Sequence, residues 1–160
     1  MKYIWILLTG LFAITTNANS EEVDRFDQLK SLAGDWKSEG TEGNEFYISF
    51  STTANGGTLI ENWIYKGKSH SLTVYHPDGD SMIATHYCPQ GNQPRLKLSN
   101  SSGENHVAFE FQDATNLANI EDSHQHSLSF EFIDENTILR SESYLESGTE
   151  TPSSMRLVRR

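Results

Sequence analysis

The chain has 160 residues, and its 22 Asp and Glu against 12 Lys and Arg give a formal net charge of −10 at pH 7. This length suits one domain with a single hydrophobic core. Phosphate backbones would repel such an acidic chain, which argues against nucleic acid as a partner. Cys88 is the only cysteine, so an intrachain disulfide is excluded.

Residues 1–20 have the composition of a secretory signal peptide. Lys2 supplies the positive start, residues 3–14 are mostly apolar without charge, and the small residues Ala18 and Ser20 suit a peptidase site. The apolar run is too short to span a bilayer as a helix. We therefore expect a periplasmic or secreted mature domain, residues 21–160, with a net charge of −11 and no membrane anchor.

The mature sequence predicts one helix followed by strands. Val23, Phe26, Leu29 and Leu32 recur at three-residue steps, which indicates a short amphipathic helix over 21–32. After Gly34, about ten alternating segments are separated by turn residues: the first opens at Trp36, followed by 45–53, 58–65, 69–76, 81–88, 95–99, 106–111, 126–132, 137–144 and 153–158.

Strands this short and this evenly spaced predict an all-β, antiparallel up-and-down barrel of about ten strands, with a sandwich as the less favoured arrangement. Closure into a barrel would remove the exposed edges of so many strands. The longest irregular segment, 113–123, is expected to form a lid or a short helix over one mouth.

The run Leu32-Ala33-Gly34-Asp35-Trp36 resembles the glycine-x-tryptophan opening of lipocalin-like, calycin-type barrels, in which the tryptophan plugs the closed end. More of the chain resembles a group of uncharacterised secreted bacterial proteins with that fold. The segments that carry this resemblance are 58–63, 75–80, 85–88 (THYC), 91–95 (GNQPR), 113–117 and the His-x-His pattern at 124–126. The resemblance implies the fold and no particular activity.

Polar and reactive side chains concentrate in residues 85–95. A three-residue turn at 77–79 would pair His76 with Asp80 and, further along, His70 with His86. Leu72, Val74, Met82, Ala84, His86 and Cys88 would then share one face, which describes a mostly apolar pocket wall. A two-residue loop at 78–79 would shift the register by one and separate the histidines.

This face favours a protein that binds a small hydrophobic or amphipathic molecule inside the barrel. The expected polar anchors at the mouth are His86, Tyr87, Asn92, Gln93 and Arg95, with Cys88, His70 and Trp63 beside them. Arginine and amides buried there would need polar partners or a ligand carboxylate. A solidly packed core with His86 as one hydrogen-bonded histidine, in a structural or interaction protein, is the alternative.

A metal-assisted or acid–base enzyme is the rival hypothesis. His124 and His126 would point to one side of a strand, and His86 or His106 could complete a three-histidine zinc site, with His86, His124 and His126 as the preferred set. Haem would need one axial histidine in a roomy barrel. Cys88 lies two residues from His86, about 7 Å along a strand, which is long for a proton-transfer pair.

Overall fold

The structure, a computed structural model, describes residues 24–160; the predicted signal peptide and the expected first helical residues, 21–23, lie outside this range. The elements are α1 (Arg25–Lys30), β1 (Gly34–Ser38), β2 (Phe46–Thr53), a 3₁₀ turn (Ala54–Gly56), β3 (Thr58–Tyr65), β4 (Lys68–Asp78), β5 (Ser81–Tyr87), β6 (Gln93–Leu98), β7 (His106–Thr115), β8 (His124–Asp134), β9 (Thr137–Glu146) and β10 (Thr149–Arg159). Among these residues, no helix has the length and apolar character needed to cross a membrane.

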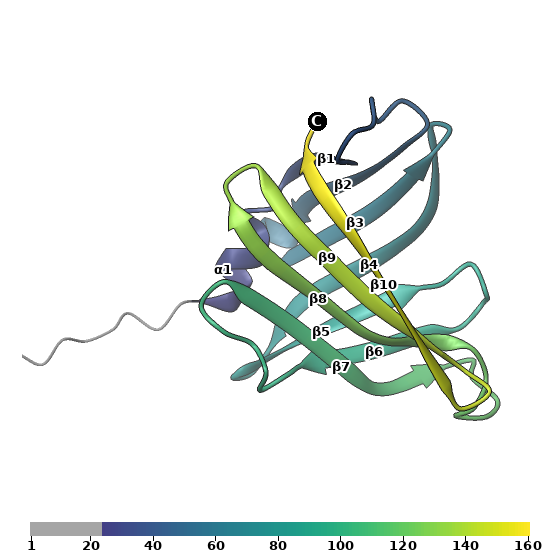
Figure 1. The fold of residues 1–160 in the computed structure, drawn as a ribbon. Helices are drawn as coiled ribbons and strands as arrows, with labels where there is room; N and C mark the ends of the chain where they lie inside the picture. Colours follow the sequence, from purple (N-terminus) through teal and green to yellow (C-terminus); the bar gives the residue numbers. More distant parts are fainter. Residues whose placement is uncertain (1–23) are drawn as a thin grey trace, which may run out of the picture.

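The ten strands form one closed antiparallel barrel (Figure 1). Each strand pairs with its neighbours in sequence, and β1 pairs with β10 to complete the ring. The structure thus confirms the predicted all-β antiparallel barrel of about ten strands with one short helix. Closure gives each of these ten strands two neighbours, although β1 and β10 pair over only three residues each.

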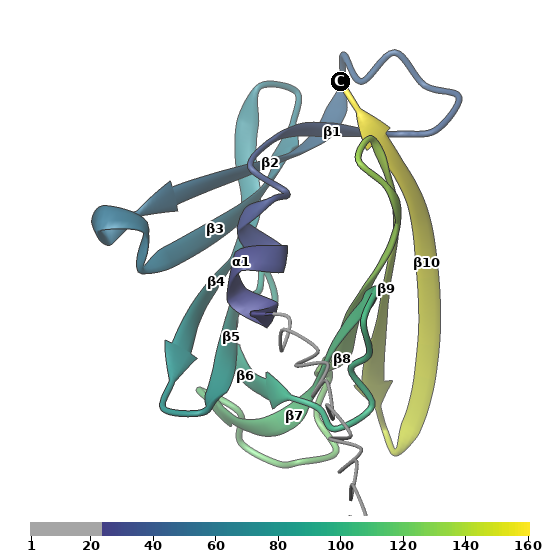
Figure 2. The same ribbon diagram turned by 90° about the vertical axis from the view of Figure 1, so that its left-hand side faces the viewer.

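Helix α1 covers one end of the barrel. Its N-cap is Asp24, whose side chain accepts hydrogen bonds from the backbone N–H groups of Phe26 and Asp27 at 2.9 and 3.2 Å. Phe26 and Leu29 point into the core, together with Leu32 beyond the helix. Figure 2 looks onto this side, where α1 lies across the opening between β2–β5 and β8–β10. We call this the closed end.

Trp36 and Arg159 complete the closed end. The Trp36 indole is 1 % exposed, and its Nε1 donates to the carbonyl of Leu32 at 2.7 Å. The Arg159 guanidinium lies over this ring at 4.5 Å and donates to the carbonyls of Ser31 and Ala33. The last strand is therefore tied to the end of the N-terminal helix.

Aromatic side chains fill the middle of the barrel. Phe50 and Tyr75 each meet Phe130 edge to face at 6.1 Å, and Phe109 lies 5.7 Å from Tyr75. Such geometry adds to the stabilisation from burial alone. The remaining buried apolar residues of this core are Phe26, Leu29, Leu32, Trp36, Ile48, Leu59, Met82, Ala84, Leu96, Val107, Leu128, Ile138 and Leu157.

The β4–β5 hairpin differs from its predicted register. The turn has two central residues, Gly79 and Asp80, and it pairs Thr73, not His70, with His86. Gly79 has a φ of +60° at the first central position, the geometry that a type II′ hairpin favours because its twist matches the strands. The predicted three-residue turn was wrong, as was the pairing of His70 with His86.

The shifted register changes which side chains of β4 point inward. Ser71, Thr73 and Tyr75 face the core, whereas Leu72 and Val74, predicted to line the pocket, lie on the outer side. On β5 the predicted inward set is confirmed, since Met82, Ala84 and His86 are all buried. The inner face of β4 therefore carries hydroxyl-bearing side chains where the prediction placed apolar ones.

The predicted lid or helix at 113–123 is a shorter loop. β7 extends to Thr115 and β8 begins at His124, which leaves residues 116–123 as turns and bends. Asn92 and Asn116 tie this loop to the turn after β5, through bonds to the carbonyls of Ser123 and Gly91 at 2.8 and 2.6 Å.

Candidate binding site at the open end of the barrel

A buried charged cluster occupies the barrel interior away from α1. Glu61 on β3 and Arg140 on β9 are 0 and 2 % exposed, and Nε of Arg140 donates to Oε1 of Glu61 at 2.7 Å. Trp63 Nε1 donates to the same carboxylate at 2.6 Å, and the Tyr75 hydroxyl donates to its Oε2 atom. Three side chains thus satisfy the Glu61 carboxylate, as a buried charge requires.

Glu142 adds a second carboxylate to this cluster. Its Oε2 atom lies 3.1 Å from Nη1 of Arg140 and accepts a hydrogen bond from Nε2 of Gln125 at 2.8 Å. Burial opposes the charge of Arg140, but Glu61 and Glu142 together raise the pKa of its guanidinium. Nη2 of Arg140 and Oε1 of Gln125 are buried without a hydrogen-bond partner among residues 24–160.

His86 lies beside this cluster, 4 % exposed on the inner face of β5. Its Nδ1 is 2.9 Å from the Thr73 hydroxyl, and its Nε2 is 3.4 Å from the Tyr144 hydroxyl. Burial lowers the pKa of His86, and burial together with Glu142 raises the pKa of Tyr144. Both rings are therefore neutral near pH 7.

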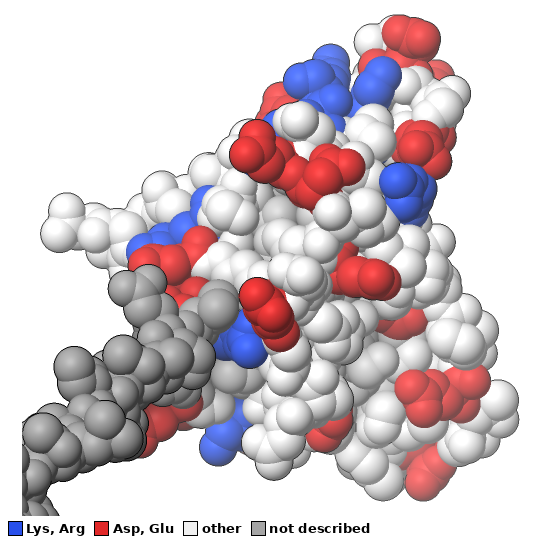
Figure 3. All heavy atoms as spheres, turned by 60° about the vertical axis from the view of Figure 1, so that its left-hand side comes forward, with Lys and Arg blue, Asp and Glu red and all other residues white. Residues whose placement is uncertain are grey.

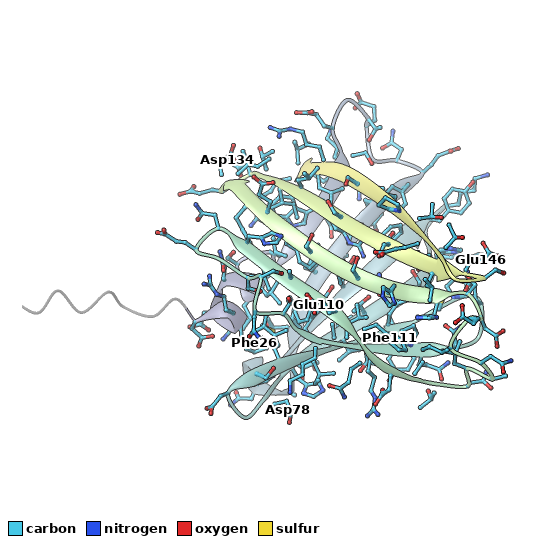
Figure 4. The ribbon with its side chains drawn as sticks, turned by 60° about the horizontal axis from the view of Figure 1, so that its bottom comes forward. Phe26, Asp78, Glu110, Phe111, Asp134 and Glu146 are labelled. Carbon is cyan, nitrogen blue, oxygen red and sulfur yellow. The ribbon has the colours of Figure 1, made fainter. Side chains whose placement is uncertain are left out.

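A cleft of about 90 Å³ opens onto these groups at the end opposite α1, which we call the open end. Figure 4 gives the orientation, with Phe26, Asp78 and Asp134 toward the closed end and Glu146 at the open end. The residues that line the cleft are Trp63, His70, Ser71, His86, Pro89, Glu142 and Tyr144. This volume equals roughly three water molecules at about 30 Å³ each.

Three of the predicted site residues meet at this cleft. Trp63, His70 and His86 line it, brought together from β3, β4 and β5. Cys88 is 8 % exposed and lies next to the Tyr144 hydroxyl.

The other predicted anchors lie elsewhere. Tyr87 is 50 % exposed because it points to the opposite side of β5 from His86. Arg95 is exposed on the outside of the barrel and bound to Asp113 through two hydrogen bonds of 2.5 and 2.6 Å. Asn92 donates a hydrogen bond to the carbonyl of Ser123, and Gln93 accepts one from the hydroxyl of Thr115. None of these four side chains lines the cleft.

His124 and His126 form a pair of their own. Nε2 of His124 is 3.4 Å from Nδ1 of His126, and the ring of Phe111 stacks on His126. A bulge between Gln125 and Ser127 interrupts the strand register at this point. Within residues 24–160, no three His, Cys, Asp or Glu side chains come together as a metal site, so the predicted set with His86 is not assembled. Haem does not fit a cleft of about 90 Å³.

Sequence reasoning missed most of the charged cluster. Arg140, Glu142 and Tyr144 follow the buried Ile138 at every second position of one strand. An arginine and a glutamate at inward positions of a strand are costly unless they meet partners. That alternation is the signal that could have found them. Glu61 has the same signal, because it follows the buried Leu59 at the second position on β3, but its partners on β4 and β9 could not be read from that strand.

No protein-family model and no curated protein sequence matches this chain.

His86 is expected to make the folded protein less stable in acid. Because its pKa is lowered in the fold, the unfolded chain takes up this proton first as the pH falls through about 6.5. The free energy of unfolding should therefore fall from there down to the lower pKa of the folded state. His86→Gln cannot titrate and should remove this component. Denaturant midpoints of both proteins from about pH 5 to 8 check it; a wild-type-minus-variant difference independent of pH would contradict it.

Proposed function

We propose that the protein is an exported ligand-binding barrel of lipocalin type, which holds the polar end of a small amphipathic molecule in the cleft at its open end. The observation that carries this proposal is the opening of the cleft onto a buried Glu61–Arg140–Glu142 cluster. The lipocalin assignment is supported by the ten-strand antiparallel barrel and by Trp36 at its closed end.

Energetics favour a functional over a structural role for this cluster. Burying three charges requires a desolvation cost that attraction between them offsets only in part, and apolar residues of similar volume often stabilise a core equally well. Charged groups kept inside a barrel next to an opening therefore mark a candidate binding site.

The cleft also limits what can bind. Sites for whole drug-sized ligands have volumes of about 300–1,000 Å³. A cleft of about 90 Å³ accepts a head group, and the apolar part of the ligand then lies outside it. This differs from the expectation that the apolar part fills the barrel, because the core aromatics occupy that space.

Native mass spectrometry of the protein purified from the secretory compartment of its own host tests this proposal. A mass excess that denaturation removes is expected, and the denatured mass should correspond to residues 21–160. Ser71→Phe, which fills the cleft, should lose the excess mass, whereas Ser153→Phe on the exposed part of β10 should keep it. A bare polypeptide, or equal retention by both variants, would contradict the proposal.

General-base catalysis by His86 is the second candidate function. The observation that favours it is a neutral imidazole at the wall of the cleft, since its lowered pKa leaves it able to accept a proton near pH 7. It predicts that His86→Gln retains a substrate which the wild-type protein converts. The same spectra would then show different bound masses for the two proteins. Identical bound masses would exclude this role.

A further inference from the structure

The carboxylate of Glu142 is the charged group that faces the cleft. Both of its contacts, with Arg140 and with Gln125, are to Oε2, and no hydrogen bond or ion pair among residues 24–160 involves its Oε1 atom. The Glu61 carboxylate is fully buried, and both of its oxygen atoms already accept hydrogen bonds, from three donors in total.

The charges around the cleft do not cancel. The cluster has two carboxylates and one guanidinium, and Arg140 is buried behind the cleft rather than in its wall. Three buried groups beside the cluster add no charge near pH 7: burial lowers the pKa of His86, and it raises the pKa values of Tyr75 and Tyr144. One negative charge is left without a counter-charge.

The cleft walls suit a positive charge as well. Trp63, His86 and Tyr144 contribute aromatic side chains to the wall, and the Trp63 ring already holds one cation, the Arg140 guanidinium, at 4.8 Å. The hydroxyl of Ser71 is an additional hydrogen-bond acceptor in the wall. A carboxylate or phosphate would instead lie against Glu142, at a cost in like-charge repulsion.

The acidic surface adds a weaker, long-range contribution of the same sign. The chain has a formal net charge of −10, and Figure 3 shows Asp and Glu spread over the face that it displays. Such a potential raises the local concentration of cations and repels anions.

We propose that this cleft binds a small protonated amine, with the Glu142 carboxylate as its counter-charge. The inference rests on the proposed binding function and names the chemical class of the ligand's head group. With about 90 Å³ available, the cleft accepts an ammonium group with a short alkyl segment. Charge-assisted hydrogen bonding to Oε1 of Glu142 would hold the ammonium group, and the aromatic side chains of the wall would contact the alkyl segment.

A titration followed by ¹⁵N-resolved NMR tests the charge preference. The probes are 1-propylammonium chloride, 1-propanol and sodium acetate, which are similar in size and differ in charge, at constant ionic strength. We expect propylammonium to shift the Trp63 indole N–H resonance and to bind about tenfold more tightly than propanol. Acetate should leave this resonance unchanged.

Two matched variants assign the effect to Glu142. Glu142→Gln keeps the shape and an acceptor oxygen and should weaken propylammonium binding about tenfold. Glu146→Gln removes the same charge from an exposed position of the same strand and should bind as the wild type does. Ser71→Phe should abolish the shift by filling the cleft, which provides a second variant if Glu142→Gln fails to fold.

The outcomes separate this inference from the proposed function. Binding of propanol or acetate at the cleft with equal or higher affinity than propylammonium would overturn the cation preference and leave the binding site in place. A propylammonium response unchanged in Glu142→Gln, or no response at Trp63 to any probe, would also overturn it. The proposed function is judged independently, by the retained mass that Ser71→Phe removes.

Discussion

Replacement of Arg140 by methionine is expected to lower the free energy of unfolding by about 3–5 kcal/mol, because it leaves the Glu61 carboxylate buried without its counter-charge. Equilibrium unfolding in urea measures this value, with two-state behaviour checked by two probes. The variant also loses the contact of the guanidinium with the Trp63 ring at 4.8 Å.

Arg95→Met is the matched control for this prediction. Arg95 lies 2.5 Å from Asp113, closer than the 2.7 Å between Arg140 and Glu61, but both side chains are exposed on the outer face of the barrel. Solvent screens such a pair, so no measurable change in stability is expected. The double variant Glu61→Gln, Arg140→Met should regain part of the loss, since it removes the unpaired charge. Equal effects of the two arginine variants would show that the buried cluster has no special role in stability.

Replacement of Trp36 by alanine is expected to destabilise the barrel to a similar extent, by about 3–5 kcal/mol. The indole is 1 % exposed, and its removal leaves a cavity under α1 and leaves Arg159 without the ring it covers. Thermal unfolding should show a fall in Tm of roughly 10 °C or more. Trp36→Phe retains much of the ring and loses the bond to the Leu32 carbonyl, so a smaller loss is expected. A Tm for Trp36→Ala within a degree or two of the wild type would contradict the role of Trp36 as the plug of the closed end.

The fold could be predicted because its signals are local. Alternation within single strands and turn residues between them define ten segments, and the predicted bounds of β3, 58–65, agree with the structure. The register of the β4–β5 hairpin could not be decided in this way. Pro77 suits a turn as well as a strand end, and Gly79 suits either of two turn positions. A shift of the register by one residue exchanges the faces of Leu72 and Thr73, so that the other of the two points inward.

For the candidate site, the sequence predicted the position of a side chain only where the period of a single strand decides its face. The inward position of His86 follows from the period of β5, and Trp63 follows from β3 in the same manner. Arg95 was predicted at the barrel mouth because polar residues are dense around it in sequence, yet alternation puts it outside with Asp113. The Glu61–Arg140 pair joins β3 to β9, and no local pattern specifies contacts between strands so distant in sequence.

The seam between β1 and β10 affects how the chain folds. Trp36 pairs with Arg159, so the first and last strands of the barrel meet only when both ends of the chain are present. Ordering so long a loop carries an entropic cost that local hairpins avoid, and contacts of this separation slow folding. The hairpins from β2 to β9 can form during synthesis, whereas the pairing of β1 with β10 requires residues 157–159. The bonds of Arg159 to the carbonyls of Ser31 and Ala33 join the same two segments, so we expect them to form together with the seam.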